Sequence, residues 1–201
     1  MPRRSQQERT GTTRAALIAS ARELFATDGY AQVSAAQIVT ASGLTRGAMY
    51  HHFADKQALF AAVFEQLETE ITAELAEVAD AAPDLLTAVV ASLARFLDIC
   101  QRPEVISIGL TDAPAVLGWE AWREIESRHG LGLLVAILER ADGQGLTLGA
   151  PVPVLAQIVL SAVIEAALMI AHASDPEAAR HDAQQALLLL LSSLITQPGG
   201  P

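Results

Sequence analysis

Residues 42–53, Ser-Gly-Leu-Thr-Arg-Gly-Ala-Met-Tyr-His-His-Phe, carry the side chains of this chain that are best suited to binding chemistry. They predict the turn and second helix of a helix-turn-helix, whose second helix enters the DNA major groove and presents its first residues to base edges. Arg46 and Tyr50 are four residues apart and share a helical face, as do Gly47 and His51. The positions expected to face inward are Leu44, Ala48, Met49 and Phe53.

The residue types on the outward face match the groups that duplex DNA offers. Arg46 can donate to guanine O6 and N7 or to a phosphate. Gly47 lets the backbone approach DNA closely, and hydroxyl or imidazole groups can donate to phosphates, which fix register. Two more candidates begin neighbouring helices, whose N-terminal amides favour phosphate. The predicted DNA-binding residues are therefore Ser34, Thr45, Arg46, Gly47, Tyr50, His51 and Lys56.

Two helices are predicted to precede this one. The first has apolar residues at helical spacing between positions 15 and 25, a cap at Thr12 or Thr13, and an end at Asp28-Gly29. Residues 1–10 are polar and are expected to be partly disordered. The second starts in a capping box, with Ser34 as N-cap and Gln37 at the third helical position.

The turn and the start of the following helix also have clear signals. Gly43 supplies the tight turn, and Thr45 is the expected N-cap of a helix ending near His52. Asp55 is the expected cap of a longer helix that has Lys56 in its first turn and extends to about Ala79. Later helices are predicted at 83–101, 103–110, 116–141, 152–173 and 177–196, with a break at Asp112-Ala113-Pro114 and a kink or division at Gly130 and Gly132.

Composition and charge favour an all-α protein with two functions. The chain is 51% hydrophobic and rich in Ala and Leu, with few aromatic residues. Its net charge is −10, but residues 1–56 contain seven basic and four acidic groups, whereas the remainder contains six basic and nineteen acidic groups. The acidic remainder would repel a polyanionic partner, so only residues 1–56 are expected to bind one. The single cysteine, Cys100, and a polar N-terminus without an apolar signal segment favour the cytoplasm.

The last two predicted helices favour a dimer. In Val152–Ala173 apolar residues occupy nearly every direction of the helical wheel, and residues 187–191 are five consecutive leucines. Such helices must be buried on all sides, and one domain of this size can hardly bury both, although a core helix inside a monomer remains the alternative. A membrane span is disfavoured, because Gln157 and Glu165 interrupt the apolar segment.

A small-molecule pocket is expected among the helices between about residues 83 and 173. Aromatic side chains offer flat apolar walls there, and His or Glu can orient a polar group. Ordinary core packing is the competing explanation for each candidate, above all for Trp122 and Cys100. The predicted ligand-binding residues are Phe96, Cys100, Leu110, Trp119, Trp122, His129, Glu165, Met169 and His172.

Catalysis and metal binding find little support in the sequence. It contains no His-x-x-x-His, Cys-x-x-Cys, phosphate-binding loop or serine-centred elbow, so we expect no enzyme, no cofactor and no metal site. The adjacent pair His51-His52 diverges on a helix and lacks a third ligand. Two alternatives stay open. One is a helical protein-interaction scaffold, and the other is a transcriptional activator with the same all-α fold.

Over about residues 12–64 the chain resembles the TetR family of bacterial transcriptional regulators. The residues that carry this resemblance are Ala21-Arg22-Glu23-Leu24-Phe25, Asp28-Gly29-Tyr30, Ile38, 42–53 and Lys56-Gln57-Ala58-Leu59-Phe60. The resemblance implies about nine helices: a three-helix DNA-binding domain at 1–55 and an effector-binding and dimerisation domain at 56–201. It further implies a homodimer formed by the last two helices, a palindromic DNA operator, and repression relieved by a small molecule.

Overall fold

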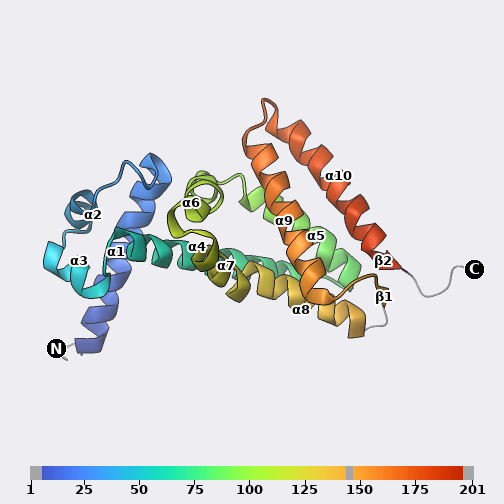
Figure 1. Cartoon of the computed structure of the whole chain (residues 1–201), viewed down its shortest axis with the longest axis horizontal. Coiled ribbons are helices and arrows are strands. Elements are labelled where there is room, and N and C mark those ends of the chain that lie inside the picture. Colours follow the sequence, from blue (N-terminus) through green and yellow to red (C-terminus); the bar gives the residue numbers. More distant parts are fainter. Residues whose placement is uncertain (1–5, 144–146, 197–201) are drawn as a thin grey trace, which may run out of the picture. The chain divides into compact units, whose positions relative to one another are not determined.

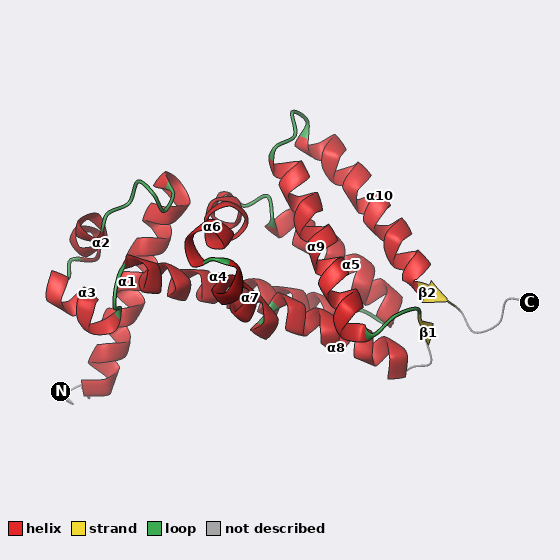
Figure 2. Cartoon of the chain, viewed as in Figure 1, coloured by secondary structure: helices red, strands yellow, loops and turns green. Residues whose placement is uncertain are grey.

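The computed structural model describes residues 6–143 and 147–196 and confirms the all-α class (Figures 1 and 2). This part of the chain forms ten α-helices, one π-helix (η1) and two short strands that pair antiparallel. The elements are α1 Gln6–Asp28, α2 Ala35–Ser42, α3 Arg46–His52, α4 Lys56–Ala81, α5 Leu85–Ile99, η1 Val105–Asp112, α6 Ala113–Leu117, α7 Trp119–Arg128, α8 Gly130–Gly143, β1 Thr147–Leu148, α9 Val152–Ala171, α10 Pro176–Leu194 and β2 Ile195–Thr196.

The chain divides into two compact units. The first contains residues up to Leu67 together with 103–122, and the second contains 68–102 and the residues from Arg123 onward. The division differs from the predicted boundary at residue 55, because η1 and the start of α4 pack with the N-terminal helices. Ser107 donates to the Phe25 carbonyl at 2.9 Å, and Arg22 forms two hydrogen bonds to Glu104 at 2.8 and 3.0 Å.

Several predicted helix ends are confirmed. Gly29 ends α1 and its amide donates to the Phe25 carbonyl at 3.0 Å. Both halves of the capping box at Ser34 are present. Asp55 caps α4 by accepting from the Ala58 amide at 2.7 Å. These signals are local, so the sequence contains most of the information that sets them.

Other predicted ends are wrong. The first helix begins at Gln6 and runs through Thr12 and Thr13 without a cap there. The N-cap of α5 is Asp84, whose carboxylate accepts from the Thr87 amide at 2.8 Å, and Pro83 lies outside the helix. For α5, the aspartate next to the predicted start is a favoured capping residue.

The expected break at Asp112-Ala113-Pro114 is also wrong, since helical structure continues from η1 into α6 there. Pro114 lies in the first turn of α6, where its fixed φ fits a helix. The chain turns instead at Gly118, with a φ of 77°. The predicted division near Gly130 and Gly132 is confirmed between α7 and α8. A Cβ at Gly132 would lie 2.9 Å from the Ser127 carbonyl oxygen, so only glycine fits this close approach.

The first unit has an aromatic centre. Phe25, Phe60 and Phe64 are fully buried, and the rings of Phe25 and Phe60 meet edge to face with centroids 5.3 Å apart. Tyr30 packs on both rings, at 5.5 Å from Phe25 and 5.1 Å from Phe60. Ile38 of α2 and Met49 of α3 bury their side chains completely, which attaches both short helices to the core of this unit.

In the second unit α5, α9 and α10 enclose an aliphatic core formed by Leu93, Leu97, Val159, Val163, Ala166, Ile170 and Leu187. By length and composition α9 is apolar enough to cross a membrane. Packing against α5, α8 and α10 accounts for much of that character, since eight of its residues are buried within the unit. The same apolarity is therefore expected of a core helix.

Two carboxyls of the second unit titrate in an unusual range. Glu126 is 6% exposed and accepts from Arg123 at 2.9 Å, and burial raises its pKa to about 7 against the opposing effect of Arg123. Burial also raises the pKa of Glu68 to about 7, and the nearby charge of Glu126 adds to the shift. The native state therefore holds protons that the unfolded chain releases at lower pH.

Glycine substitutions at the helix-turn-helix should have opposite effects on stability. Gly43 has a φ of 66° and open space where a methyl group would lie, so Gly43→Ala should lower the free energy of unfolding by about 1–2 kcal/mol through backbone strain alone. Gly47 is helical, and its Cβ would meet only Thr45 Oγ1, at 3.9 Å. Gly47→Ala should leave the protein at least as stable. Urea unfolding followed by circular dichroism measures both, and equal losses would contradict the assignment.

The raised carboxyl pKa values predict a pH dependence of stability. Between the unfolded pKa and about 7 the native state binds more protons than the unfolded chain, so the free energy of unfolding should fall as pH rises through this window. Glu68→Gln should flatten that dependence, and Glu120→Gln, at an exposed position, should not. Urea titrations between about pH 5 and about pH 8 test this, and an unchanged slope in Glu68→Gln would refute the assignment.

Candidate nucleic-acid interface

Helix α3 is short and is fixed at both ends. Thr45 adopts an extended backbone, and its hydroxyl accepts from the Ala48 amide at 3.1 Å. At the other end the Phe53 amide donates to the Met49 carbonyl at 2.9 Å. Met49 is the fully buried residue of this helix, and the guanidinium of Arg14 lies 5.3 Å from the centroid of the Phe53 ring. The seven residues thus have one buried side and a defined orientation.

The opposite side of α3 is exposed and carries the predicted DNA-binding types. Thr45, Arg46, Gly47, Tyr50 and His51 are all exposed. The Arg46 guanidinium lies 5.5 Å from the centroid of the Tyr50 ring, whose side chain is 43% exposed. This stacking holds a cation and a phenol side by side on one face. The structure therefore brings together the five residues that the helical spacing grouped.

Ser34 lies at the start of α2 and is exposed, but its hydroxyl already has partners. It accepts from the Gln37 amide at 3.3 Å and donates to the Gln37 side-chain oxygen at 2.7 Å. The Gln37 oxygen also accepts from the Ser34 amide at 2.8 Å. The observed role of Ser34 is to cap the helix, and its phosphate contact stays a prediction.

Lys56 has a structural role that the sequence did not indicate. Its ammonium donates to the carbonyl oxygens of Tyr30, at 2.9 Å, and Val33, at 2.8 Å, and lies 3.8 Å from the centroid of the Tyr30 ring. Burial lowers its pKa, and the charge of Asp112 partly opposes this shift. Two of its three donors thus hold the loop between α1 and α2, and a phosphate contact by Lys56 stays a prediction.

Asp112 is a second residue of the first unit whose role the sequence did not show. Its carboxylate accepts from the Tyr30 amide at 2.7 Å. Together with Lys56 it fixes the loop that ends at Ser34, and the two residues come from the two separate chain segments that make up this unit. The contact of Lys56 with Tyr30 spans 26 positions of the sequence, and that of Asp112 with Tyr30 spans 82, so no local sequence pattern predicts either contact.

The predicted ligand-binding residues do not share one cavity. Leu110, Trp119 and Trp122 belong to the first unit, where the rings of the exposed Trp119 and the buried Trp122 lie 5.5 Å apart. The other residues belong to the second unit. On α9 and at its C-terminal end the three candidates Glu165, Met169 and His172 are exposed and lie outside the cavity wall.

Two further candidates, Cys100 and His129, lie inside the second unit but away from its cavity wall. Cys100 is buried, and burial raises the pKa of its thiol, so it is an unreactive core residue. His129 is half-buried where α7 meets α8. Phe96 alone of the nine lines the cavity, and a ligand contact by any of the others stays a prediction without support from this geometry.

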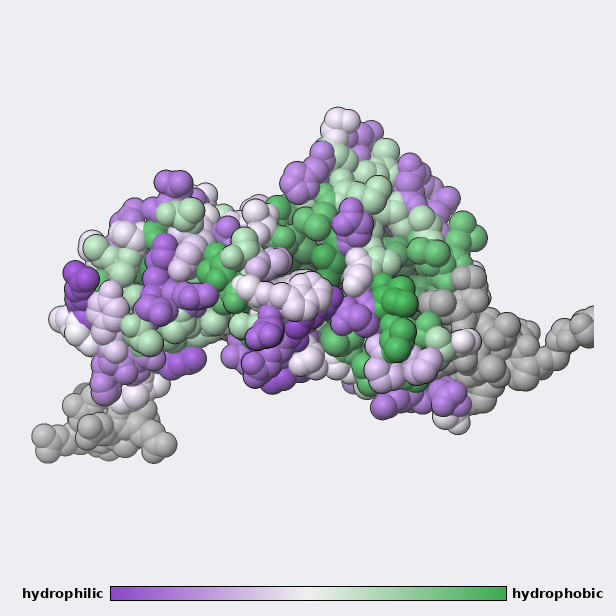
Figure 3. Space-filling model, in the orientation of Figure 1, coloured by the Kyte–Doolittle hydropathy of each residue, from purple (hydrophilic) through white to green (hydrophobic). Residues whose placement is uncertain are grey.

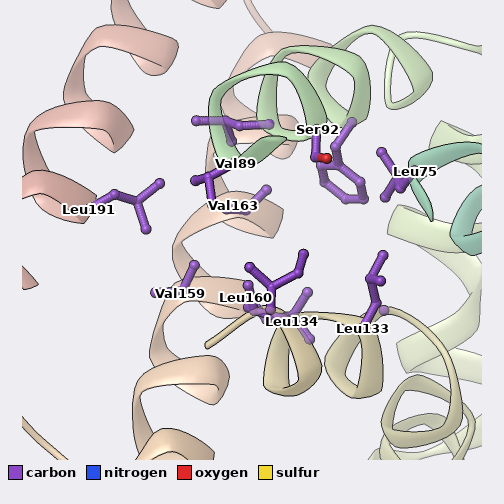
Figure 4. Close-up of a pocket in the computed structure, with 13 residues that line it drawn as sticks. Leu75, Val89, Ser92, Leu133, Leu134, Val159, Leu160, Val163 and Leu191 are labelled. Atoms are coloured by element: carbon purple, nitrogen blue, oxygen red, sulfur yellow. The ribbon is translucent and has the colours of Figure 1, made fainter. Parts of the chain in front are cut away.

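The cavity of the second unit has a volume of about 110 Å³ (Figure 4). Its walls come from α4, α5, α8, α9 and α10, and are formed by Leu75, Val89, Ser92, Leu93, Phe96, Gly130, Leu133, Leu134, Ile137, Val159, Leu160, Val163 and Leu191. Aliphatic residues at helical spacing serve equally as core and as cavity wall, so the sequence held no signal that separates the two. Within residues 6–143 and 147–196 no group of three His, Cys, Asp or Glu side chains is placed to hold a metal ion.

Comparison with known sequences agrees with this geometry. Residues 17–63 match the family described as bacterial regulatory proteins, tetR family, and residues 86–194 match the tetracyclin repressor-like C-terminal domain. The transposon Tn10 TetC protein of Escherichia coli is 29% identical over 135 residues, which are 67% of this chain and 68% of TetC. The HTH-type transcriptional regulator CymR of Pseudomonas putida is 43% identical over 70 residues, 35% of this chain and 34% of CymR.

A solved structure is similar over almost the whole chain. A TetR-family transcriptional regulator from Pectobacterium atrosepticum superposes with a TM-score of 0.82 at 35% sequence identity, covering 98% of this chain and 100% of that one. The C-terminal domain match alone spans more than half of the sequence. This chain belongs to the TetR family of bacterial regulatory proteins and is a helix-turn-helix transcriptional regulator.

Proposed function

We propose that this regulator is a homodimeric repressor that binds a palindromic operator through α3 and leaves it when a small molecule binds the second unit. The observation that carries the proposal is the exposed Arg46–Tyr50 pair on a helix whose other side is anchored by Met49. A capped helix that presents a cation and hydrogen-bond donors outward is suited to the major groove. Operator DNA and a buried thiol also favour the cytoplasm as its location.

The proposed contacts divide into two kinds. Arg46 reaches guanine O6 and N7 and supplies base preference, while Gly47 lets the backbone come close. Thr45, Tyr50 and His51 donate to phosphates and set the register. Ser34 and Lys56 contribute through the helix N-termini that they border, where backbone amides face the DNA backbone. The basic excess of residues 1–56 supports this assignment, and binding should weaken as salt concentration rises.

Helices α9 and α10 supply the proposed dimer interface. Large apolar side chains are exposed on both: Val154, Ile158 and Met169 on α9, and Leu189 and Leu190 on α10. Hydrophobic side chains reach the surface in this region (Figure 3). Exposed apolar residues on two neighbouring helices mark a protein contact, and a second copy of the chain satisfies it with two-fold symmetry. Such symmetry places two α3 helices about one DNA turn, roughly 34–36 Å, apart.

Effector control requires only a modest coupling between sites. A ligand that changes operator affinity by about 5–150-fold needs a coupling free energy of about 1–3 kcal/mol. The cavity lined by Phe96 is the proposed ligand site. Helices α4 and α7 contain residues of both units, so a ligand-dependent shift of either helix extends along the chain into the DNA-binding unit.

Substitutions on α3 should separate affinity from base preference. Arg46→Ala should weaken binding by about 1–3 kcal/mol and relax base preference in each half-site, because a bidentate contact to guanine is lost. Tyr50→Phe should weaken binding by about 0.5–1.5 kcal/mol on all sequences. Fluorescence anisotropy on duplexes enriched from a random pool measures both. Arg128→Ala removes an exposed arginine of α7 and is the matched control. Unchanged affinity in both α3 variants would refute the proposed interface.

A charge on α10 should dissociate the dimer. Leu189 is 72% exposed in the single chain, and Leu189→Glu would bury a carboxylate at the proposed interface. Analytical ultracentrifugation should show monomers of Leu189→Glu. Because the dimer is lost, the affinity of this variant for the full operator should also fall. Leu86→Glu alters a leucine of α5 that is 69% exposed and should leave the dimer intact. A dimer that persists in Leu189→Glu, or one lost in Leu86→Glu instead, would place the interface elsewhere.

A further inference from the structure

The cavity of the second unit has one polar group in an otherwise apolar wall. Its lining consists of aliphatic residues together with Phe96, Gly130 and Ser92. Ser92 carries the only side-chain oxygen among the residues labelled in Figure 4. No Arg, Lys, His, Asp or Glu of the described residues belongs to the lining. The wall therefore offers a large apolar contact area, and Ser92 is its one residue with a hydrogen-bonding side chain.

The Ser92 hydroxyl has an unsatisfied hydrogen-bonding capacity. Its oxygen is buried and has no hydrogen-bond partner in the described part of the chain. A buried hydroxyl without a partner destabilises a protein, and alanine at this helical position would avoid that cost. The hydroxyl oxygen of Thr72 on α4 is likewise buried without a partner among the described residues, but Thr72 does not line the cavity. Of these two residues, Ser92 belongs to a wall that a ligand can contact, and Thr72 does not.

We propose that the effector is a small, uncharged, largely apolar molecule whose single hydrogen-bonding group meets the Ser92 hydroxyl inside this cavity. The inference rests on the proposed function, because it names the ligand class of the site through which operator binding is relieved. The cavity volume is about 110 Å³. An apolar cavity of about 150 Å³ engineered into another protein takes up benzene, so the occupant expected here has the size of one ring.

Electrostatics exclude a charged occupant. An ionised ligand would lose its hydration without gaining a counter-ion, since no charged side chain of the described residues lines the wall. A carboxylate lies close to the Gly130 part of the wall: Glu68 Oε2 is 3.8 Å from the position of a Cβ at Gly130. Burial and the neighbouring Glu126 raise the pKa of Glu68 to about 7, which weakens its attraction for a cation at neutral pH.

Four ligands with the same ring test this chemistry on the full-length protein: benzyl alcohol, toluene, benzoate and benzylammonium, compared by isothermal titration calorimetry. Benzyl alcohol should bind about two- to tenfold more tightly than toluene, the range expected for one hydrogen bond. Toluene should still bind, whereas benzoate and benzylammonium should bind at least about tenfold more weakly than benzyl alcohol. Tighter binding of either ion, or no binding of any of the four, would overturn the proposal.

One variant of Ser92 and one of Thr72 test where the ligand forms its hydrogen bond. Ser92→Ala should abolish the preference for benzyl alcohol over toluene while toluene affinity stays unchanged. Thr72→Val removes the hydroxyl of Thr72 without touching the wall, and it should keep the full preference. The thermal midpoint of ligand-free Ser92→Ala should equal or exceed that of the parent, which shows that the variant folds. A preference that survives in Ser92→Ala would contradict the assigned contact.

Operator binding in the same samples separates the two proposals. One outcome is that benzyl alcohol binds selectively in a Ser92-dependent way while operator affinity is unchanged. This outcome supports the ligand class and contradicts the proposal that a ligand in this cavity releases the operator. Operator binding that persists while none of the four ligands binds overturns the ligand class and leaves the DNA-binding proposal standing. Selective uptake together with reduced operator affinity supports both.

Discussion

One buried side chain, that of Met49, determines how α3 can face DNA. Helices of seven residues have little stability in water, so α3 depends on its caps and on packing against α1 and α2. Because Met49 is its only fully buried residue, the direction in which this side chain points decides which residues remain exposed. Arg46 and Tyr50 lie on the exposed side for that reason.

The DNA-binding unit was predictable where local chemistry decides the structure, and not where distant residues do. Capping groups at Ser34 and Thr45 act over three residues, and Gly43 adopts the left-handed turn that its type suggested. The contacts of Lys56 with the loop carbonyls, and of Asp112 with Tyr30, depend on a fold that no short pattern encodes. The start predicted at Thr12 is wrong because the helix already begins at Gln6, and the start predicted at Pro83 is wrong because the neighbouring Asp84 supplies the N-cap.

Apolar helices in the second unit supply core residues, cavity wall and the proposed dimer surface, and their sequences do not distinguish these three. Within α9, Val163 packs in the core and lines the cavity, while Ile158 is 58% exposed and available to a partner. Helical periodicity predicted the helix itself, but the division of its faces depends on where α5, α8 and α10 lie. For this reason Phe96 is the one predicted ligand residue that lines the cavity, and Ser92, a small residue in an apolar segment that also lines it, was not among the predicted residues.

Methylation interference on an enriched duplex tests the placement of α3 most directly. Methyl groups at guanine N7 block the major groove, and those at adenine N3 block the minor groove. The account predicts interference at guanine N7 in two half-sites centred about one helical turn apart, with the strongest guanine signal absent when Arg46 is replaced by alanine. Interference confined to adenine N3, or a pattern that does not depend on Arg46, would contradict it.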